Sequence, residues 1–86
     1  MNITAQNTFT PAVLIQAGDI FDVSISGTFV ATVTVQRSKD SSTWFDVDNF
    51  TAPAEKTGVS GSAWYFRVGV KTGGFTSGTV VAEIYS

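Results

Sequence analysis

An almost unbroken alternation of apolar and polar residues constrains this chain more than any other feature. In the stretch SGTFVATVTVQRSKDSSTWFDVDNF, residues 26–50, apolar side chains recur at every second position on both sides of the polar segment SKDSS. Successive side chains of a strand point to opposite faces, so a period of two predicts strands with one buried and one solvated face. The stretch therefore predicts a β-hairpin, which we expect at the centre of a sheet.

The alternation also predicts which hairpin side chains face the core. In the first strand the buried set is Phe29, Ala31, Val33 and Val35. The polar segment 38–42 has the composition of a turn. In the return strand, residues 43–49, the core-facing residues are Phe45 and Val47, and the residues on the other side are Trp44, Asp46 and Asp48.

Other segments predict further strands. These are residues 3–9, 12–16, 19–26, 64–70 and 79–85. Residues 51–63 break the pattern with Pro53, Gly58 and Gly61, and predict a loop or an irregular edge. Strands at roughly ten-residue spacing predict an all-β fold, a small antiparallel β-sandwich or barrel of about six to seven strands with no helix longer than one turn.

The length of 86 residues predicts one domain, residues 1–86. Residues 1–11 are polar and weakly patterned, and predict either an extended arm that reaches a neighbour or a simple edge strand. We expect neither a signal peptide nor a membrane-spanning segment, because the longest apolar runs are far shorter than the ~20 residues a bilayer requires. We therefore expect a soluble product used at full length.

Composition removes several kinds of chemistry. The chain has no His and no Cys, which excludes disulfides, thiolate zinc sites and Ser-His-Asp or Cys-His nucleophiles. Lys39, Lys56 and Lys71 fall in or beside predicted turns, where nothing would desolvate them for catalysis. A net charge of −2 argues against sequence-independent binding of nucleic acid. We expect a protein that is not an enzyme, with no cofactor, no metal and no nucleic-acid or membrane partner.

Asp46 and Asp48 are the pair most suggestive of chemistry. Two residues apart on a strand, they are predicted on one face with Cα atoms ~6.6–6.8 Å apart, close to the carboxyl spacing of glycosidases. With Asn49 they could also bind calcium, although the twelve-residue calcium loop is absent. Because one small sheet offers little cleft, we interpret them as solvent-facing carboxylates.

Aromatic residues are numerous, and we expect Phe21, Phe29, Phe45 and Phe66 in the core. Others fall on the opposite parity, at strand ends or in a turn, and form the predicted partner interface: Trp44, Phe50, Tyr65 and Phe75. KTGGFTSG, residues 71–78, predicts a Gly-rich turn, and Phe75 in this turn either folds back over the end of the core or docks on a partner. Exposed Trp and Tyr anchor protein interfaces, and they also stack on sugar rings. Only 14% of residues are charged, where about 25% is typical, which suits contact with other proteins.

The strings SGTFVATVTVQRSKDSSTWFDVDNFTAP and WYFRVGVKTGGFTSGTVVAEI resemble small virion proteins of tailed bacteriophages. The resemblance spans about two-thirds of the chain. The matching positions are Gly27–Ser38, Asp40, Thr43–Val47, Tyr65–Gly73 and Thr76–Val80. The turn KDSSTW is shorter than in that group, where an insertion containing Gly is common.

This resemblance implies a structural component of the phage particle. The favoured role is a head decoration (cement) protein, made soluble in the host cytoplasm and then located on the capsid surface of the virion. Its implied partners are the major capsid protein and copies of itself, as a trimer on the shell. A neck or tail component, or a receptor- or carbohydrate-binding module using Trp44 or Tyr65, is the alternative.

Overall fold

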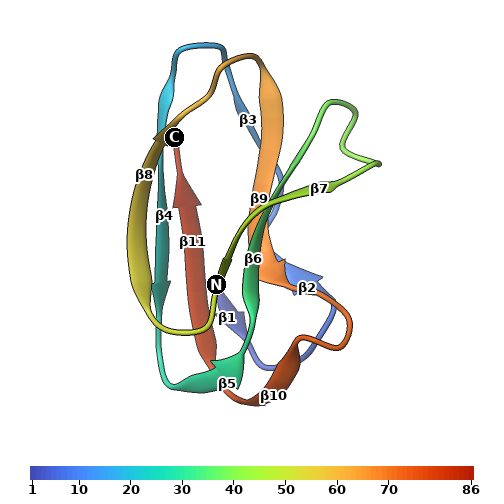
Figure 1. Ribbon diagram of the computed structural model, residues 1–86, viewed down its shortest axis with the longest axis vertical. Helices are drawn as coiled ribbons and strands as arrows, with labels where there is room; N and C mark the ends of the chain where they lie inside the picture. Colours follow the sequence, from blue (N-terminus) through green and yellow to red (C-terminus); the bar gives the residue numbers. More distant parts are fainter.

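The alternating segments form strands of two antiparallel sheets that face each other across a layer of apolar side chains (Figure 1). The computed structural model describes all residues, 1–86. The strands are β1 (Asn2–Ile3), β2 (Thr8–Phe9), β3 (Val13–Ile15), β4 (Ile20–Ser26), β5 (Phe29–Ala31), β6 (Val33–Ser38), β7 (Phe45–Phe50), β8 (Ala54–Val59), β9 (Trp64–Val70), β10 (Phe75–Gly78) and β11 (Val80–Tyr85). None of these elements is a helix able to cross a membrane.

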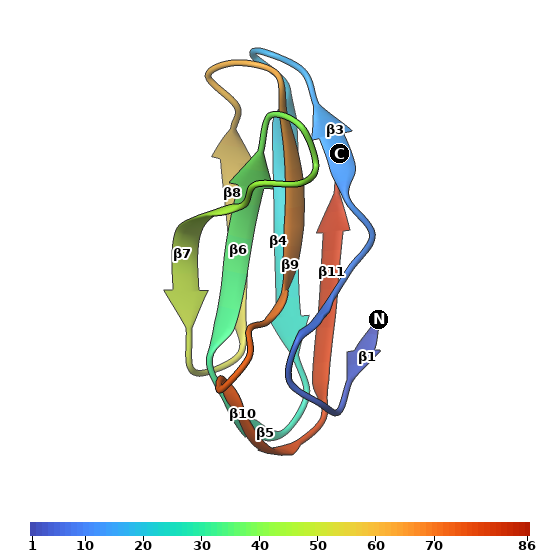
Figure 2. The same cartoon turned by 90° about the vertical axis from the view of Figure 1, so that its right-hand side faces the viewer.

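Each sheet has its own strand order. Sheet A runs β1-β11-β4-β8. Sheet B runs β2-β9-β6-β7, and β3 also pairs with β9. A separate ribbon of β5 and β10 lies across one end (Figure 2). The sheets do not close on each other, since β7 and β8 end their sheets as edges, so the all-β prediction is confirmed as an open sandwich and not as a barrel.

The core is built mainly from β-branched side chains contributed by both sheets. Eleven hydrophobic residues are buried: Ile3, Ile15, Val23, Ile25, Val33, Val35, Phe66, Val68, Val70, Val80 and Ala82. Strand β4 follows its predicted alternation, because Val23 and Ile25 are buried and Asp22 is exposed. Such side chains have few rotamers and fit well on a pleated surface.

Residues 1–11 supply one short strand to each sheet. Strand β1 pairs with β11 in sheet A, and β2 pairs with β9 in sheet B. The predicted single strand over residues 3–9 is therefore wrong. The chain leaves one layer and enters the other between Ile3 and Thr8.

The segment 51–63, predicted as a loop or irregular edge, contains the edge strand β8. This strand pairs with β4 from Ile20–Val59 to Ile25–Ala54. Pro53 lies just before the strand, where its missing N–H leaves no ladder bond unmade. The loop interpretation is therefore wrong, and the edge interpretation is confirmed.

The predicted hairpin forms, but only one of its strands is central. Strand β6 lies between β9 and β7, whereas β7 is an edge strand. The first strand is also interrupted at Thr32, whose backbone N–H donates to the carbonyl of Gly74. Strand β5 then pairs with β10, in a segment that was predicted as a turn.

A β-bulge at Val47 divides strand β7 into two parts with opposite parity. Asp48 pairs with Val35 and Asp46 pairs with the next residue, Gln36, so Val47 is the extra residue. Trp44 and Asp46 lie on the predicted solvent side. Asp48 lies on the same side as the core residue Val35. The prediction that Asp46 and Asp48 share one face is therefore wrong. A bulge adds one unpaired residue and therefore reverses the alternation beyond it.

The same strand corrects the predicted positions of two aromatic residues. Phe50 pairs with Val33 and packs against the core. Phe45 has the predicted parity, but its side chain is 56% exposed, so its assignment to the core is wrong. It begins β7 next to the hairpin loop, which projects away from sheet A in Figure 1.

Two isoleucines of β4 test the sandwich directly. Ile25 is 2% exposed and Ile20 is 62% exposed, on opposite faces of one strand. We expect Ile25→Ala to lower the free energy of unfolding by about 2–5 kcal/mol, because it leaves a cavity in the core. Ile20→Ala should change it by no more than about 0.5 kcal/mol. Urea denaturation measures both, and equal losses would contradict the assignment of faces.

The hairpin turn is held by one carboxylate. Asp40 Oδ1 accepts hydrogen bonds from the backbone N–H groups of Thr43 and Ser42 and from the Ser38 hydroxyl, each at 2.9 Å. These bonds, the Thr43 N–H first, lower the pKa of Asp40 from 3.8 to about 2. Ser41, which lies between Asp40 and Ser42, has a positive φ of 62°, a value that few residues with a side chain adopt.

This depressed pKa predicts a pH-dependent contribution of the turn. The charged form of Asp40 is favoured by the fold, so its contribution is complete above pH 3.8 and is lost as the pH falls towards 2. Asp40→Asn keeps the Oδ1 acceptor but removes the charge. We expect the difference in melting temperature between wild type and this variant to be larger at about pH 5 than at about pH 2. A difference that stays constant over the range would show that the charge has no role.

Candidate functional site

The outer face of sheet B carries an arginine held between two aromatic rings. The guanidinium carbon of Arg67, on β9, lies 4.0 Å from the ring centroid of Phe9 and 4.1 Å from that of Trp44. Phe9 comes from β2 on one side of β9, and Trp44 directly precedes β7 on the far side of β6. Cation–π contacts of this kind attract the guanidinium to both rings and fix its position.

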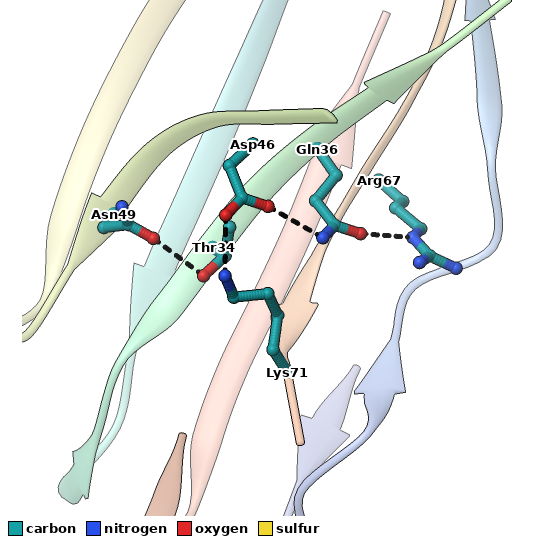
Figure 3. Close-up of polar contacts among 6 residues, drawn as sticks. All are labelled: Thr34, Gln36, Asp46, Asn49, Arg67 and Lys71. Atoms are coloured by element: carbon teal, nitrogen blue, oxygen red, sulfur yellow. Dashed lines mark hydrogen bonds and ion pairs between the residues drawn. The ribbon is translucent and has the colours of Figure 1, made fainter. Parts of the chain in front are cut away.

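A line of hydrogen bonds continues from this arginine across the sheet (Figure 3). Arg67 Nε donates to Gln36 Oε1 at 2.9 Å, and Gln36 Nε2 donates to Asp46 Oδ1 at 2.9 Å. Asp46 Oδ2 accepts from Lys71 Nζ at 2.6 Å. We call the residues of this line and the two rings the arginine face: Phe9, Gln36, Trp44, Asp46, Arg67 and Lys71.

The charges of the arginine face are partly desolvated and partly paired. The hydrogen bond from Lys71, and then that from Gln36, lowers the pKa of Asp46, which therefore stays ionised at neutral pH. Burial lowers the pKa of Arg67, but an arginine starts so high that it remains a cation. With Lys71 included, the face carries two positive charges and one negative charge.

Arg67 keeps donors available for a partner. Only its Nε donates a hydrogen bond within the chain, and no unpartnered side-chain nitrogen is buried. Figure 3 shows its two terminal nitrogens pointing away from Gln36. They border a shallow hollow of about 380 Å³ lined by Asn7, Phe9, Gln36, Arg67, Lys71 and Thr72. The arrangement can bind a carboxylate or another planar anion at a fixed position.

A second surface lies along the open side of the sandwich, between the edge strands β7 and β8. A mainly apolar groove of about 200 Å³ there reaches core residues. Val47 lines it and is exposed, and the exposed Phe45 lies two residues before Val47 on β7. The lining of the groove is Phe21, Val23, Val35, Val47, Asp48, Phe50, Lys56, Thr57 and Gly58. We call Phe45, Val47 and this groove the edge groove.

The four predicted interface residues do not come together. Trp44 and Tyr65 are half-buried on the outer side of sheet B, where Tyr65 pairs with the exposed Leu14. Phe50 and Phe75 instead pack against the core. Phe75 therefore takes the first of its two predicted positions, folding back over the end of the core.

Most residues of these two surfaces were not predicted as site residues, and Arg67, Phe9 and Phe45 show the reasons. No site was predicted at Arg67, because its aromatic partner Phe9 is distant in sequence and belongs to a segment with little pattern. Phe45 was placed in the core, because alternation gives the parity of a side chain and not the extent of the opposite sheet. A signal for Arg67 was available in WYFRVGV, where it is the one charge on a solvent face next to Tyr65.

Asp46 and Asp48 do not form the acid pair whose spacing resembled that of glycosidases. Asp46 belongs to the arginine face and is bonded to Gln36 and Lys71. Asp48 lines the edge groove on the other side of the strand. The bulge thus separates them, although both are exposed as the preferred interpretation required.

Gly69 keeps Phe9 close to Arg67, and this gives a test. A Cβ at Gly69 would collide with the Thr8 carbonyl oxygen and lie 2.6 Å from the Phe9 Cα, so backbone would have to move. We expect Gly69→Ala to cost about 1–3 kcal/mol of unfolding free energy and to displace β2. Hydrogen exchange of the Thr10 N–H, which donates to the Val68 carbonyl, should accelerate. Gly61→Ala is the control, since nothing lies within 4 Å of its added Cβ. Equal stability of the two variants would contradict this contact.

Comparison with known proteins does not assign the two surfaces. Scans against protein-family models, curated proteins and solved structures found no match to this chain.

Proposed function

We propose that this chain is a non-enzymatic structural protein of a tailed-bacteriophage particle, a head decoration protein that binds and stabilises the assembled capsid. The sequence resemblance described above supports the phage assignment. The observation that carries a binding role is the edge groove, an apolar surface left open beside the core. Exposed apolar surface flanked by polar residues is typical of protein interaction sites.

The edge groove is suited to contact with a coat protein. Val47 lines the groove and is exposed, and the exposed Phe45 lies two residues before it on the same edge strand. Asp48 and Lys56 supply one charge of each sign among its lining residues. Large exposed aromatic side chains at the centre of an interface contribute most of its binding energy. The few charges of the chain lower the desolvation cost of burying the surrounding Thr, Ser and Gly residues.

Such a protein would act by mass action on the shell. A ligand that binds the assembled lattice but not the free coat subunits stabilises the lattice by RT ln(1 + [L]/Kd). Because the lattice repeats its site many times, an oligomer of decoration proteins can combine modest single contacts into a firm attachment. The neck or tail remains the alternative location within the particle.

A sugar-binding role is less favoured by the geometry. Trp44 is the obvious stacking platform, but one face of its ring is already covered by the guanidinium of Arg67. At most one face is left for a sugar ring. We therefore propose that the partner of this chain is a protein and not a sugar.

The test is a binding experiment with particles of the phage that encodes the chain, stripped of it. We expect purified protein to co-sediment with expanded capsids and not with isolated coat subunits. Phe45→Ser should weaken this binding about tenfold or more, as loss of an interface anchor does. Val30→Ser is the matched control, since Val30 is 59% exposed against 56% for Phe45 and lies on β5, outside the lining of the edge groove.

The copy number separates the locations. Hundreds of copies per virion in quantitative mass spectrometry would support the shell, and tens or fewer the neck or tail. A virion without the chain, or capsids that never bind it, would refute the proposal.

A further inference from the structure

The outer face of sheet A carries only acidic charged side chains. Glu55 on β8 and Glu83 on β11 both pair with Ser24 of β4, and Asp22 lies two residues before Ser24 on the same face. Lys56 pairs with the buried Val23, so it belongs to the opposite side. We call this surface, with Asp22, Glu55 and Glu83, the acidic face.

Two of these carboxylates have no cation to neutralise them. Asp22 accepts a hydrogen bond from the Thr57 hydroxyl at 3.0 Å, and Glu55 accepts one from Ser24 at 2.9 Å. Glu83 is the exception, because it contacts the amino group of Met1. The acidic face therefore offers at least two carboxylates that are held in position and lack a positive partner.

Apolar side chains adjoin the charges on both faces of the sandwich. On the acidic face these are Ile20, Val59 and Tyr85, all exposed. On the outer side of sheet B, Leu14 is exposed and pairs with Tyr65, which lies two residues from Arg67. Each face thus combines charge of one predominant sign with apolar surface, as interfaces do.

We propose that copies of this chain associate head to tail, the arginine face of one copy against the acidic face of the next. The terminal nitrogens of Arg67 donate to the carboxylates of Asp22 and Glu55 of the second copy. The stacking of Arg67 between Phe9 and Trp44 holds the guanidinium in place before binding, so little side-chain entropy is lost.

A second copy is the occupant because this chain itself supplies the complementary charges. The two faces lie on opposite sides of the sandwich, so no copy can satisfy both within itself (Figures 1 and 2). A contact between different surfaces of identical chains is heterologous, and it repeats from copy to copy until a ring closes or a row forms. The inference does not depend on the proposed phage role.

Sedimentation of mixed variants tests this arrangement. Arg67→Gln disables the arginine face, and the double variant Asp22→Asn, Glu55→Gln disables the acidic face. We expect the mass of the wild-type protein to rise with concentration and to fall with added salt, because salt screens exposed charges. Each variant alone should associate about tenfold or more weakly, since a charge-paired anchor is lost.

An equimolar mixture of the two variants decides the matter. Each retains the face that the other needs, so the mixture should form dimers of one copy of each and nothing larger. This complementation also shows that both variants are folded. The controls are Arg37→Gln and Asp48→Asn. The guanidinium of Arg37 lies 4.3 Å from the ring centroid of Trp64, on the other side of the sheet from the arginine face, and Asp48 lines the edge groove. Both should associate as wild type does.

Three results would overturn the proposal. The first is a wild-type protein that stays monomeric up to about 1 mM, the weak end of measurable affinities. The second is undiminished association of both variants. The third is a mixture that stays monomeric under conditions in which the wild type associates.

Discussion

The contact between the two layers of β-branched side chains is the constraint on which the rest of the structure depends. The chain has no cysteine, so no disulfide bond can add to the stability that this layer provides. A small domain buries a modest part of its surface, so its stability depends strongly on that layer. The layer also determines the register, because a slip of one residue would turn the buried set of a strand towards solvent.

The alternation of residues predicted the class of fold and the buried faces of the longer strands. It succeeded for β4 and β9 because each runs through the middle of its sheet, where one face is covered. It failed at Phe45, where the opposite sheet does not extend, and at Asp48 and Phe50, where an inserted residue reverses the parity. Neither the extent of the partner sheet nor a bulge leaves a mark in a single sequence.

The surfaces were less predictable than the core, for a related reason. Trp44 was placed on the solvent side, but its contact with Arg67 joins the residue before β7 to β9, and Phe9 is added from β2. Such a cluster depends on strand order, which periodicity does not contain. Of the rings predicted for a partner interface, Trp44 contacts a guanidinium and Phe50 and Phe75 pack against the core. Phe45, which was assigned to the interior, is 56% exposed.

The bulge at Val47 has a consequence for how this protein behaves in a crowded solution. Strand β7 is an edge with exposed apolar side chains, the kind of border along which foreign strands add and fibrils start. An unpaired extra residue bends that border and breaks the even spacing of its free N–H and C=O groups. The bulge that reverses the alternation thus also makes this edge a poorer template for the pairing of further strands.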